Sequence, residues 1–287
     1  ALGYTNFKTK ARPWWDLHDQ LSAASKVVPE SFKIGIDFNG TLHDAEHAER
    51  ILPDLERKFP VLDIIETPIP QEDVAGGKRV QAATKTQIAH HYGSPPVKVQ
   101  LKENLCDGFV VSSGPKYGGG LSKNMQQADV CAMADKPLWL HHVGTGLTAA
   151  FSLHVAAVLP AAKWAAVNCH QLFRADLLKP TFTVKNGTAA IPEKPGLGFD
   201  LDTDALEAFR IETPKEKPFG PDRLLRVAYP DGQTWYYAHG RQCYEHAMTG
   251  TLPVFPRGVR LETVPNDASD RWRKLHRQTL KGPVREP

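Results

Sequence analysis

Two lysines near the start of the chain have a spacing that suits proton transfer. Lys8 and Lys10 stand two residues apart in the segment Phe7–Lys10. If this segment is a β-strand, both side chains face the same side of it. Two ammonium groups held this close destabilise each other's charged form, and a lysine in that state can abstract a proton at neutral pH. The alternative is a pair of surface lysines on an edge strand.

Three further polar residues have the chemistry of metal ligands. Asp37, Glu66 and His90 each follow directly on apolar residues, in three successive segments of the chain. Neighbouring strands lie about 4.8 Å apart, so these side chains would converge on one divalent ion if the segments are adjacent strands. A capping or turn role is the alternative for each residue alone, but the three together favour a metal site.

The segments that carry these residues recur with a nearly constant period. Seven short β-rich segments begin at residues 7, 33, 62, 87, 108, 138 and 163. They are Phe7–Lys10, Lys33–Asn39, Leu62–Thr67, Gln87–Tyr92, Gly108–Ser113, Leu138–Val143 and Lys163–Asn168. Helical periodicity marks the segments Asp16–Val27, Asp44–Phe59, Gln71–Thr84, Leu121–Asp135 and Thr148–Leu159. Strand, helix and strand at this spacing predict an α/β protein with a parallel sheet.

Two architectures with parallel sheets are compatible with this alternation. An open doubly wound sheet usually has a G-x-G-x-x-G turn after an early strand, and none follows the first strands here. The triple glycine Gly118–Gly120 has no lysine or hydroxyl in P-loop register. The constant period favours a β/α barrel of the TIM type, whose catalytic groups lie at the C-terminal ends of the strands. Such a barrel would be one strand short, and we expect the missing strand to precede Ala1.

The regular alternation stops after Asn168. Asn186-Gly187 predicts a hairpin turn, and Asp202 predicts the start of a helix. Asp231-Gly232 predicts a second hairpin, between strands over 224–229 and 234–238. We therefore expect two regions: a barrel over residues 1–210 that contains strands 2–8, and a partly ordered C-terminal extension over residues 211–287 that is not a second catalytic domain.

The composition narrows the class of protein. The 287 residues are 41% hydrophobic, and no apolar run approaches the ~18–20 residues of a membrane span. A formal net charge of +3 argues against a nucleic-acid partner. The one dense basic stretch, from Arg271 to Arg285, is expected to be a solvated tail. Four scattered cysteines without C-x-x-C spacing exclude a zinc ribbon and fit the reduced thiols of a cytoplasmic protein.

The order of these motifs resembles the enolase superfamily. Lys-x-Lys, then Asp on the next strand, then Ile-Glu-x-Pro and a polar group after the following strand all occur in this order. The closer similarity is to the mandelate racemase and muconate lactonizing enzyme branch, which includes acid-sugar dehydratases. The similarity continues through Gly118–Gly120, Leu153–Ala157 and Lys163-Trp164, and it closes at Lys194–Asp202. It covers roughly residues 5–210.

The resemblance implies a modified (β/α)7β barrel that binds a divalent ion, usually Mg²⁺, through three carboxylates at strand ends. The ion holds the carboxylate of a small-molecule substrate and stabilises the enediolate that forms when the α-proton is removed. Asp37 and Glu66 match the first two ligand positions, Lys10 matches the base, and Lys8 matches the group that neutralises the substrate carboxylate. Members carry an N-terminal capping domain, which we expect to be missing here, and these barrels commonly form homo-oligomers.

Three positions depart from the family pattern. His90 stands where the third carboxylate is expected, and imidazole suits Mn²⁺ or Fe²⁺ better than Mg²⁺. Ser112 or Ser113 stands where an aspartate often occurs. His141 therefore lacks a carboxylate partner, and we expect it to act as a general acid rather than a strong base. The stretch around Ala166 lacks the glutamate that some members supply.

These expectations define one leading hypothesis and two alternatives. We predict a metal-dependent lyase that removes the proton α to a carboxylate and eliminates water from an acid-sugar-like substrate. Its predicted catalytic residues are Lys8, Lys10 and His141, and its predicted metal ligands are Asp37, Glu66 and His90. A racemase or epimerase of a 2-hydroxy acid is one alternative, with His141 as a second base. A non-catalytic binding paralogue with a decayed site is the other.

Overall fold

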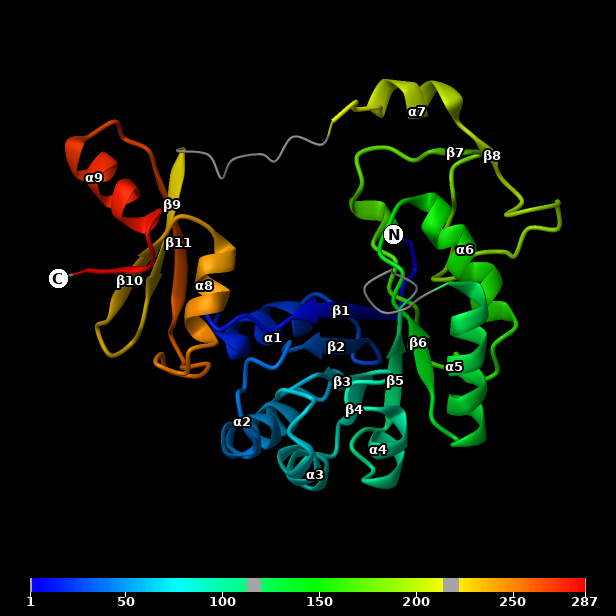
Figure 1. Ribbon diagram of the computed structural model, residues 1–287, viewed down its shortest axis with the longest axis horizontal. Helices are drawn as coiled ribbons and strands as arrows, with labels where there is room; N and C mark the ends of the chain where they lie inside the picture. The colour runs from blue at the N-terminus through cyan, green and yellow to red at the C-terminus, as the bar shows by residue number, and fades with distance from the viewer. Residues whose placement is uncertain (1, 113–119, 214–221, 287) are drawn as a thin grey trace. The chain divides into compact units, whose positions relative to one another are not determined.

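A computed structural model describes residues 2–112, 120–213 and 222–286 (Figure 1). The chain divides into two compact units. The first comprises Ala1–Lys8, Lys33–Gly35 and Thr86–Pro214, and the second comprises Thr9–Phe32, Ile36–Lys85 and Lys215–Pro287. Ser113, Gly118 and Gly119, which the sequence singled out, lie outside the described residues.

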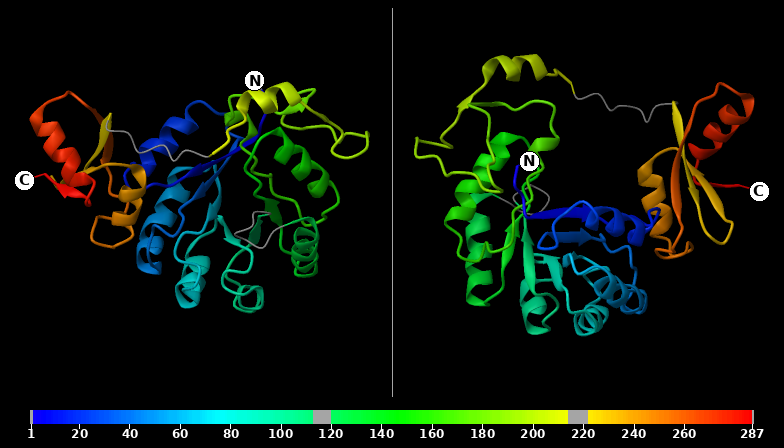
Figure 2. Two further views of the ribbon diagram at one scale, coloured as in Figure 1. Left: turned by 45° about the horizontal axis from the view of Figure 1, so that its top comes forward. Right: turned by 180° about the vertical axis from the view of Figure 1, so that it is seen from behind.

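Six strands alternate with helices in the order that the sequence predicts. The strands are β1 (Asn6–Lys10), β2 (Lys33–Asp37), β3 (Leu62–Glu66), β4 (Gln87–His91), β5 (Gly108–Val111) and β6 (Leu138–Leu140). The helices are α1 (Leu17–Ser25), α2 (Ala45–Lys58), α3 (Val74–Ala83), α4 (Val97–Lys102), α5 (Leu121–Met133) and α6 (Gly146–Ala157). The strands follow the sheet order β1-β2-β3-β4-β5-β6, and β4, β5 and β6 pair in parallel (Figure 2).

Aspartates begin three of these helices. The side chains of Asp16, Asp44 and Asp73 accept hydrogen bonds from backbone amides in the first turns of α1, α2 and α3. Aspartate is a strong N-cap because its carboxylate satisfies amides that have no partner within the helix. The helix α4 was not predicted, since its six residues are too few to show a helical period.

The predicted seventh strand, Lys163–Asn168, is wrong. The structure has a single parallel bridge there, between His141 and Val167. Val167 N donates to Leu140 O at 2.9 Å, and His142 N donates to Val167 O at 3.0 Å, so the segment runs along β6 without becoming a regular strand. Two consecutive alanines before Val167 have low strand propensity, which explains the irregularity.

The segment beyond residue 168 contains the predicted turn and helix start. Asn186 and Gly187 have φ angles of 51° and 73°, as a two-residue hairpin turn with positive φ at both positions requires. Only one bridge, between Lys185 and Thr188, flanks the turn. The pair β7 (Leu178–Lys179) and β8 (Asp200–Leu201) precedes α7 (Thr203–Phe209), and Asp202 caps that helix.

Residues 222–286, here called the C-terminal module, form an antiparallel sheet with two helices. The sheet order is β11-β9-β10-β12. Its elements are β9 (Arg223–Ala228), β10 (Thr234–Tyr237), α8 (Gly240–Ala247), β11 (Arg260–Pro265), α9 (Asp270–Thr279) and β12 (Val284–Arg285). The predicted hairpin at Asp231-Gly232 is confirmed, since Thr234 pairs with Ala228 and Gly232 has φ 88°.

The basic stretch near the C-terminus is not a tail, contrary to the prediction. It forms α9, which Ser269 caps, and Trp272 on this helix is buried. The Trp272 ring stacks on His276, one turn further on, with centroids 4.9 Å apart. The basic side chains of the helix remain at the surface, whereas Trp272 and Thr279 are its buried residues.

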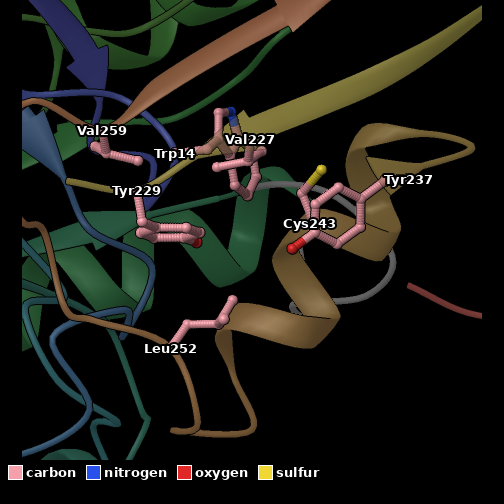
Figure 3. Packing of buried hydrophobic residues seen from close by; sticks show 7 residues of the cluster. All are labelled: Trp14, Val227, Tyr229, Tyr237, Cys243, Leu252 and Val259. Carbon is pink, nitrogen blue, oxygen red and sulfur yellow. The ribbon is translucent and has the colours of Figure 1, made fainter. Parts of the chain in front are cut away.

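The core of the C-terminal module includes one residue from the start of the chain. Val227, Tyr229, Tyr237, Cys243, Leu252 and Val259 form a buried cluster with Trp14 (Figure 3). Trp14 belongs to the loop between β1 and α1. The indole therefore joins this loop to the module through apolar burial.

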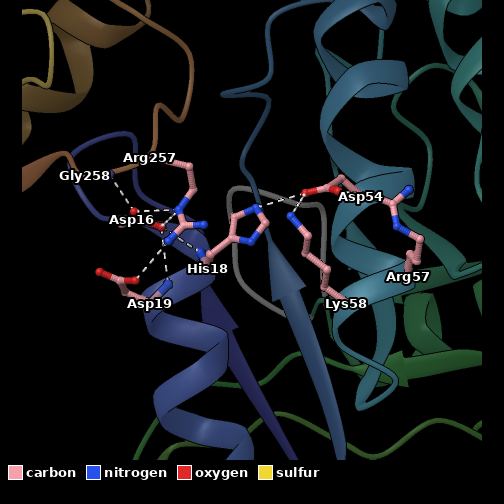
Figure 4. A network of polar contacts seen from close by, with 8 residues as sticks. All are labelled: Asp16, His18, Asp19, Asp54, Arg57, Lys58, Arg257 and Gly258. Atoms are coloured by element: carbon pink, nitrogen blue, oxygen red, sulfur yellow. Dashed lines mark hydrogen bonds and ion pairs between the residues drawn. The ribbon is translucent and has the colours of Figure 1, made fainter.

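A polar network joins the same loop to the module. Asp16 accepts hydrogen bonds from Arg257 Nε at 2.9 Å and from Gly258 N at 2.6 Å (Figure 4). Burial by itself raises the pKa of the Asp16 carboxyl, but the bonds from Gly258 and Arg257 outweigh it, and the pKa lies below its ordinary value. The folded chain therefore favours the ionised carboxylate.

Replacing Asp16 by asparagine should destabilise the chain in a pH-dependent way. Asparagine keeps the helix cap but loses the charge, and we expect a loss of about 1–2 kcal/mol in the free energy of unfolding at pH 7. Because the folded pKa is depressed, the carboxylate's contribution is complete above the ordinary value near 4 and disappears as pH falls through the folded pKa. The difference between wild type and Asp16→Asn in urea unfolding should shrink below about pH 4. Asp54→Asn, at an ion pair on α2, should change the midpoint less; an equal effect would contradict this assignment.

Over the ranges that the structure describes, no helix combines the length and apolar character needed to cross a bilayer. The four cysteines are free thiols, and three of them, Cys106, Cys131 and Cys243, are buried.

Candidate active site

Lys10, at the end of β1, contacts a carboxylate on β2. Its Nζ forms an ion pair with Asp37 Oδ2 and donates a hydrogen bond to Asn39 Oδ1 at 3.2 Å. Asp37 is fully buried, so the lysine supplies the positive charge that a buried carboxylate requires. The predicted base therefore lies beside the first predicted metal ligand, in the second unit.

Glu66 ends β3 level with the point at which Asp37 ends β2. Ala11 N donates to Asp37 O at 2.9 Å and Phe38 N donates to Glu66 O at 3.0 Å, so the hydrogen-bond ladder continues past each strand end. Both carboxylate residues are at most 1% exposed. Two buried carboxylates on neighbouring strands are costly without positive charge, and hard oxygen atoms suit Mg²⁺. Asp37 and Glu66 fit two ligands of a divalent ion by this donor chemistry.

Two tryptophans of the first unit mark one side of β4, β5 and β6, here called the tryptophan side. The rings of Trp139 and Trp164 lie 5.2 Å apart, and Trp164 Nε1 donates to Gln87 Oε1 at 3.2 Å. A Cβ atom on Gly108 would lie 2.4 Å from the Trp164 ring, so only glycine fits there. Lys8 Nζ lies 5.9 Å from the centroid of the Trp139 ring, a cation–π distance.

Three polar residues continue the tryptophan side at the strand ends. Side chains an even number of residues apart along a strand share a side. His91 therefore lies on the same side as Gln87, Ser112 on the same side as Gly108, and His141 on the same side as Trp139. The rings of His91 and His141 lie 6.4 Å apart. The buried Ser112 Oγ has no hydrogen-bond partner among the described residues. Lys8 and His141, two predicted catalytic residues, thus lie on the same side.

His90 lies on the opposite side of β4 from His91. On that side its neighbour Tyr92 packs edge-to-face against Phe109, with ring centroids 5.5 Å apart. His90 itself is 2% exposed. The sequence does not distinguish His90 from His91, because two adjacent histidines at a strand end give no indication of which one faces the tryptophan side.

His142, next to His141, has a structural environment. It is buried, and its Nδ1 lies 2.7 Å from Ser152 Oγ on α6, which also accepts from Asn168 Nδ2 at 3.0 Å. Burial lowers the pKa of His142 to about 4, so the ring is neutral at physiological pH. These bonds hold the end of β6 against α6.

The three predicted metal ligands do not form a cluster in the part of the chain that the structure describes. Within residues 2–112, 120–213 and 222–286, no group of three or more His, Cys, Asp or Glu side chains lies close enough to hold an ion. The ligand set Asp37, Glu66 and His90 therefore stays a prediction, of which Asp37 and Glu66 are the buried carboxylate pair.

Strands that alternate with helices, with lysines and carboxylates at their carboxyl ends, define an α/β barrel-like fold with its chemistry at the strand ends. A family model described as enolase C-terminal domain-like matches residues 1–205. The chain belongs to this family, which confirms the resemblance to the enolase superfamily.

Curated relatives and a solved structure agree with this membership. The chain is 32% identical to D-xylonate dehydratase of Haloferax volcanii over 152 residues, which cover 52% of the chain and 36% of that protein. It is 24% identical to arabinonate dehydratase of Saccharolobus solfataricus over 220 residues, covering 74% of the chain and 57% of that protein. The solved structure of an enolase from Thermobispora bispora, complexed with magnesium and formate, is similar with a TM-score of 0.60 at 23% identity. The matched region covers 72% of this chain and 49% of that enolase chain. The chain thus spans about a third to just over half of these proteins' lengths.

Proposed function

We propose that this chain belongs to a metal-dependent lyase that eliminates water from an acid-sugar-like substrate. The observation that carries the proposal is the contact of Lys10 with the buried Asp37, level with the buried Glu66 on the next strand. The dehydratase names of the two curated relatives support the substrate class. A cytoplasmic, homo-oligomeric enzyme remains our expectation.

We assign the side chains roles that fit their charges and that the family resemblance implies. Lys10 Nζ takes the proton α to the substrate carboxylate, and the electron pair of that bond moves toward the carboxylate to give an enediolate. Its collapse forms a carbon–carbon double bond as the β C–O bond breaks. His141 gives a proton to the departing hydroxyl, which leaves as water. Lys8 balances the negative charge of the carboxylate. A divalent ion on Asp37 and Glu66 would supply charge stabilisation for the enediolate, and Mg²⁺ is the family expectation.

We propose that His91, rather than His90, is the imidazole that faces the substrate or the ion. Only His91 shares the tryptophan side with Lys8 and His141. An imidazole ligand would suit Mn²⁺ or Fe²⁺ better than Mg²⁺.

Exchanging either histidine for alanine should therefore have unequal effects on metal binding. We expect His91→Ala to weaken Mn²⁺ binding by at least about tenfold in isothermal titration, since losing one ligand costs more than losing an outer partner. His90→Ala should change the Mn²⁺ affinity less than about threefold. Because His90 is buried, the same change should lower the stability of the chain. The reverse order would restore His90 as the ligand.

A panel of acid sugars tests the proposed reaction. The whole chain is incubated with aldonic and aldaric acids and with Mg²⁺, Mn²⁺ or Fe²⁺, and 2-keto-3-deoxy products are measured. Dehydration of at least one acid supports the proposal. No product with any acid and any ion, from a folded chain, would count against it.

One observation favours racemisation as the second candidate. His141 lies on the tryptophan side with Lys8, where it can serve as the second base that a racemase requires. Incubation in D₂O separates the two reactions. Deuterium incorporation at the α-carbon without loss of water would indicate a racemase or epimerase.

A further inference from the structure

The C-terminal module contacts the loops that follow β1 and β2. Trp14 and Asp16, in the loop after β1, join its core and its Arg257. Phe38, directly after β2, packs edge-to-face against Phe255 of the module, with ring centroids 5.5 Å apart. All of these residues lie in the second unit. The loops in question are the ones that carry Lys10 and Asp37 at their starts.

Asn39 connects the charged groups at these two strand ends. Its Oδ1 accepts hydrogen bonds from Lys10 Nζ at 3.2 Å and from Arg12 Nη1 at 2.9 Å. Its backbone N donates to Asp37 Oδ1 at 2.8 Å, and its Nδ2 donates to Asp37 Oδ2 at 3.2 Å. The side chain of Asn39 thus contacts the Lys10 ammonium and Asp37 Oδ2, and its backbone amide holds Asp37 Oδ1.

The backbone of Asn39 has φ 51°, a left-handed conformation that other contacts must stabilise. Asparagine tolerates this left-handed conformation better than most residues, but the surrounding contacts must hold it. The hydroxyl of Tyr244, on α8 of the module, donates to Asn39 O at 3.1 Å. Gly40 N, the next amide, donates to Thr67 O at 2.8 Å. The module thus holds one end of the peptide that carries the Asn39 side chain.

We propose that the C-terminal module positions the proposed base. Tyr244 is a positioning residue that holds Asn39, and Asn39 orients Lys10 and Asp37. The module is therefore part of the machinery for proton abstraction rather than an appendage. This inference rests on the proposed function only for the role of Lys10 as the base.

Two tyrosines of the module provide a matched pair for the test. Tyr244→Phe removes the hydroxyl that reaches Asn39, whereas Tyr236→Phe removes a hydroxyl that donates to Glu286 at 3.1 Å inside the module. Hydrogen–deuterium exchange of the full chain is followed in peptides over residues 36–44. We expect Tyr244→Phe to raise exchange there by about fivefold, because one hydrogen bond is lost locally. Tyr236→Phe should leave these peptides unchanged.

Kinetics separate positioning from a purely structural role. If an acid sugar is dehydrated, Tyr244→Phe should lower kcat by about fivefold with KM changed less than about twofold, and Tyr236→Phe should change neither. Unchanged exchange over residues 36–44 in Tyr244→Phe would overturn the proposal, as would an unchanged kcat. Faster exchange together with no acid-sugar turnover by wild type would support the positioning role while contradicting the proposed function.

Discussion

Replacing Lys10 by alanine should lower the turnover of a dehydrated acid sugar by roughly 10³-fold, the usual effect of losing a general base. Lys10 Nζ contacts both Asp37 and Asn39 at the end of β2. The same change should not weaken Mn²⁺ binding, because it removes a cation that competes for the Asp37 carboxylate. The measurements are kcat for the best substrate and Mn²⁺ affinity by isothermal titration.

Lys33→Ala is the matched control for this experiment. Lys33 is an exposed lysine at the start of β2, at the opposite end of the strand from Asp37. Its replacement should leave both kcat and Mn²⁺ affinity at the wild-type values. Turnover that survives in Lys10→Ala would show that another group takes the proton.

Replacing Glu66 by glutamine should weaken Mn²⁺ binding by at least about 100-fold, since a direct ligand matters more than the outer partners whose loss costs 10–100-fold. Glutamine keeps the shape of the side chain and removes its negative charge. Glu66 is 1% exposed and lies level with Asp37. Turnover should fall in parallel with the metal affinity.

Asp63→Asn, in the same strand, controls for a general change of charge. Asp63 is three residues before Glu66 and is only half-buried. The variant should bind Mn²⁺ like wild type. Equal weakening by both variants would point to long-range electrostatics, and wild-type affinity in Glu66→Gln would remove Glu66 from the ligand set.

Much of the fold could be predicted from local patterns. Short apolar segments at a constant period predicted β1 to β6, and acidic N-caps such as Asp16 and Asp44 marked the helix starts. The turn at Asp231-Gly232 was predictable because glycine readily takes the positive φ that Gly232 has at this hairpin. The segment 163–168 failed, since a β-like composition does not ensure the partners that a regular strand requires.

The site could be predicted only in part. The sequence alone predicts that Lys8 and Lys10 face the same side of β1, because they stand two residues apart. It also predicts the carboxylates at the ends of β2 and β3. The choice between His90 and His91 does not follow from the sequence, because the two face opposite sides of the strand and have the same chemistry. The contacts of Trp139 and Trp164 show where the tryptophan side lies, and the proposal of His91 rests on them.

The sequence by itself determined that two lysines and two carboxylates stand at the ends of successive strands, because strand period and motif order are local properties. The tertiary structure decided what holds them in place. Tyr244 is 205 residues from Asn39, and Arg257 is 241 residues from Asp16. No local pattern records such pairs, since they form only when folding brings the C-terminal module against the loops after β1 and β2.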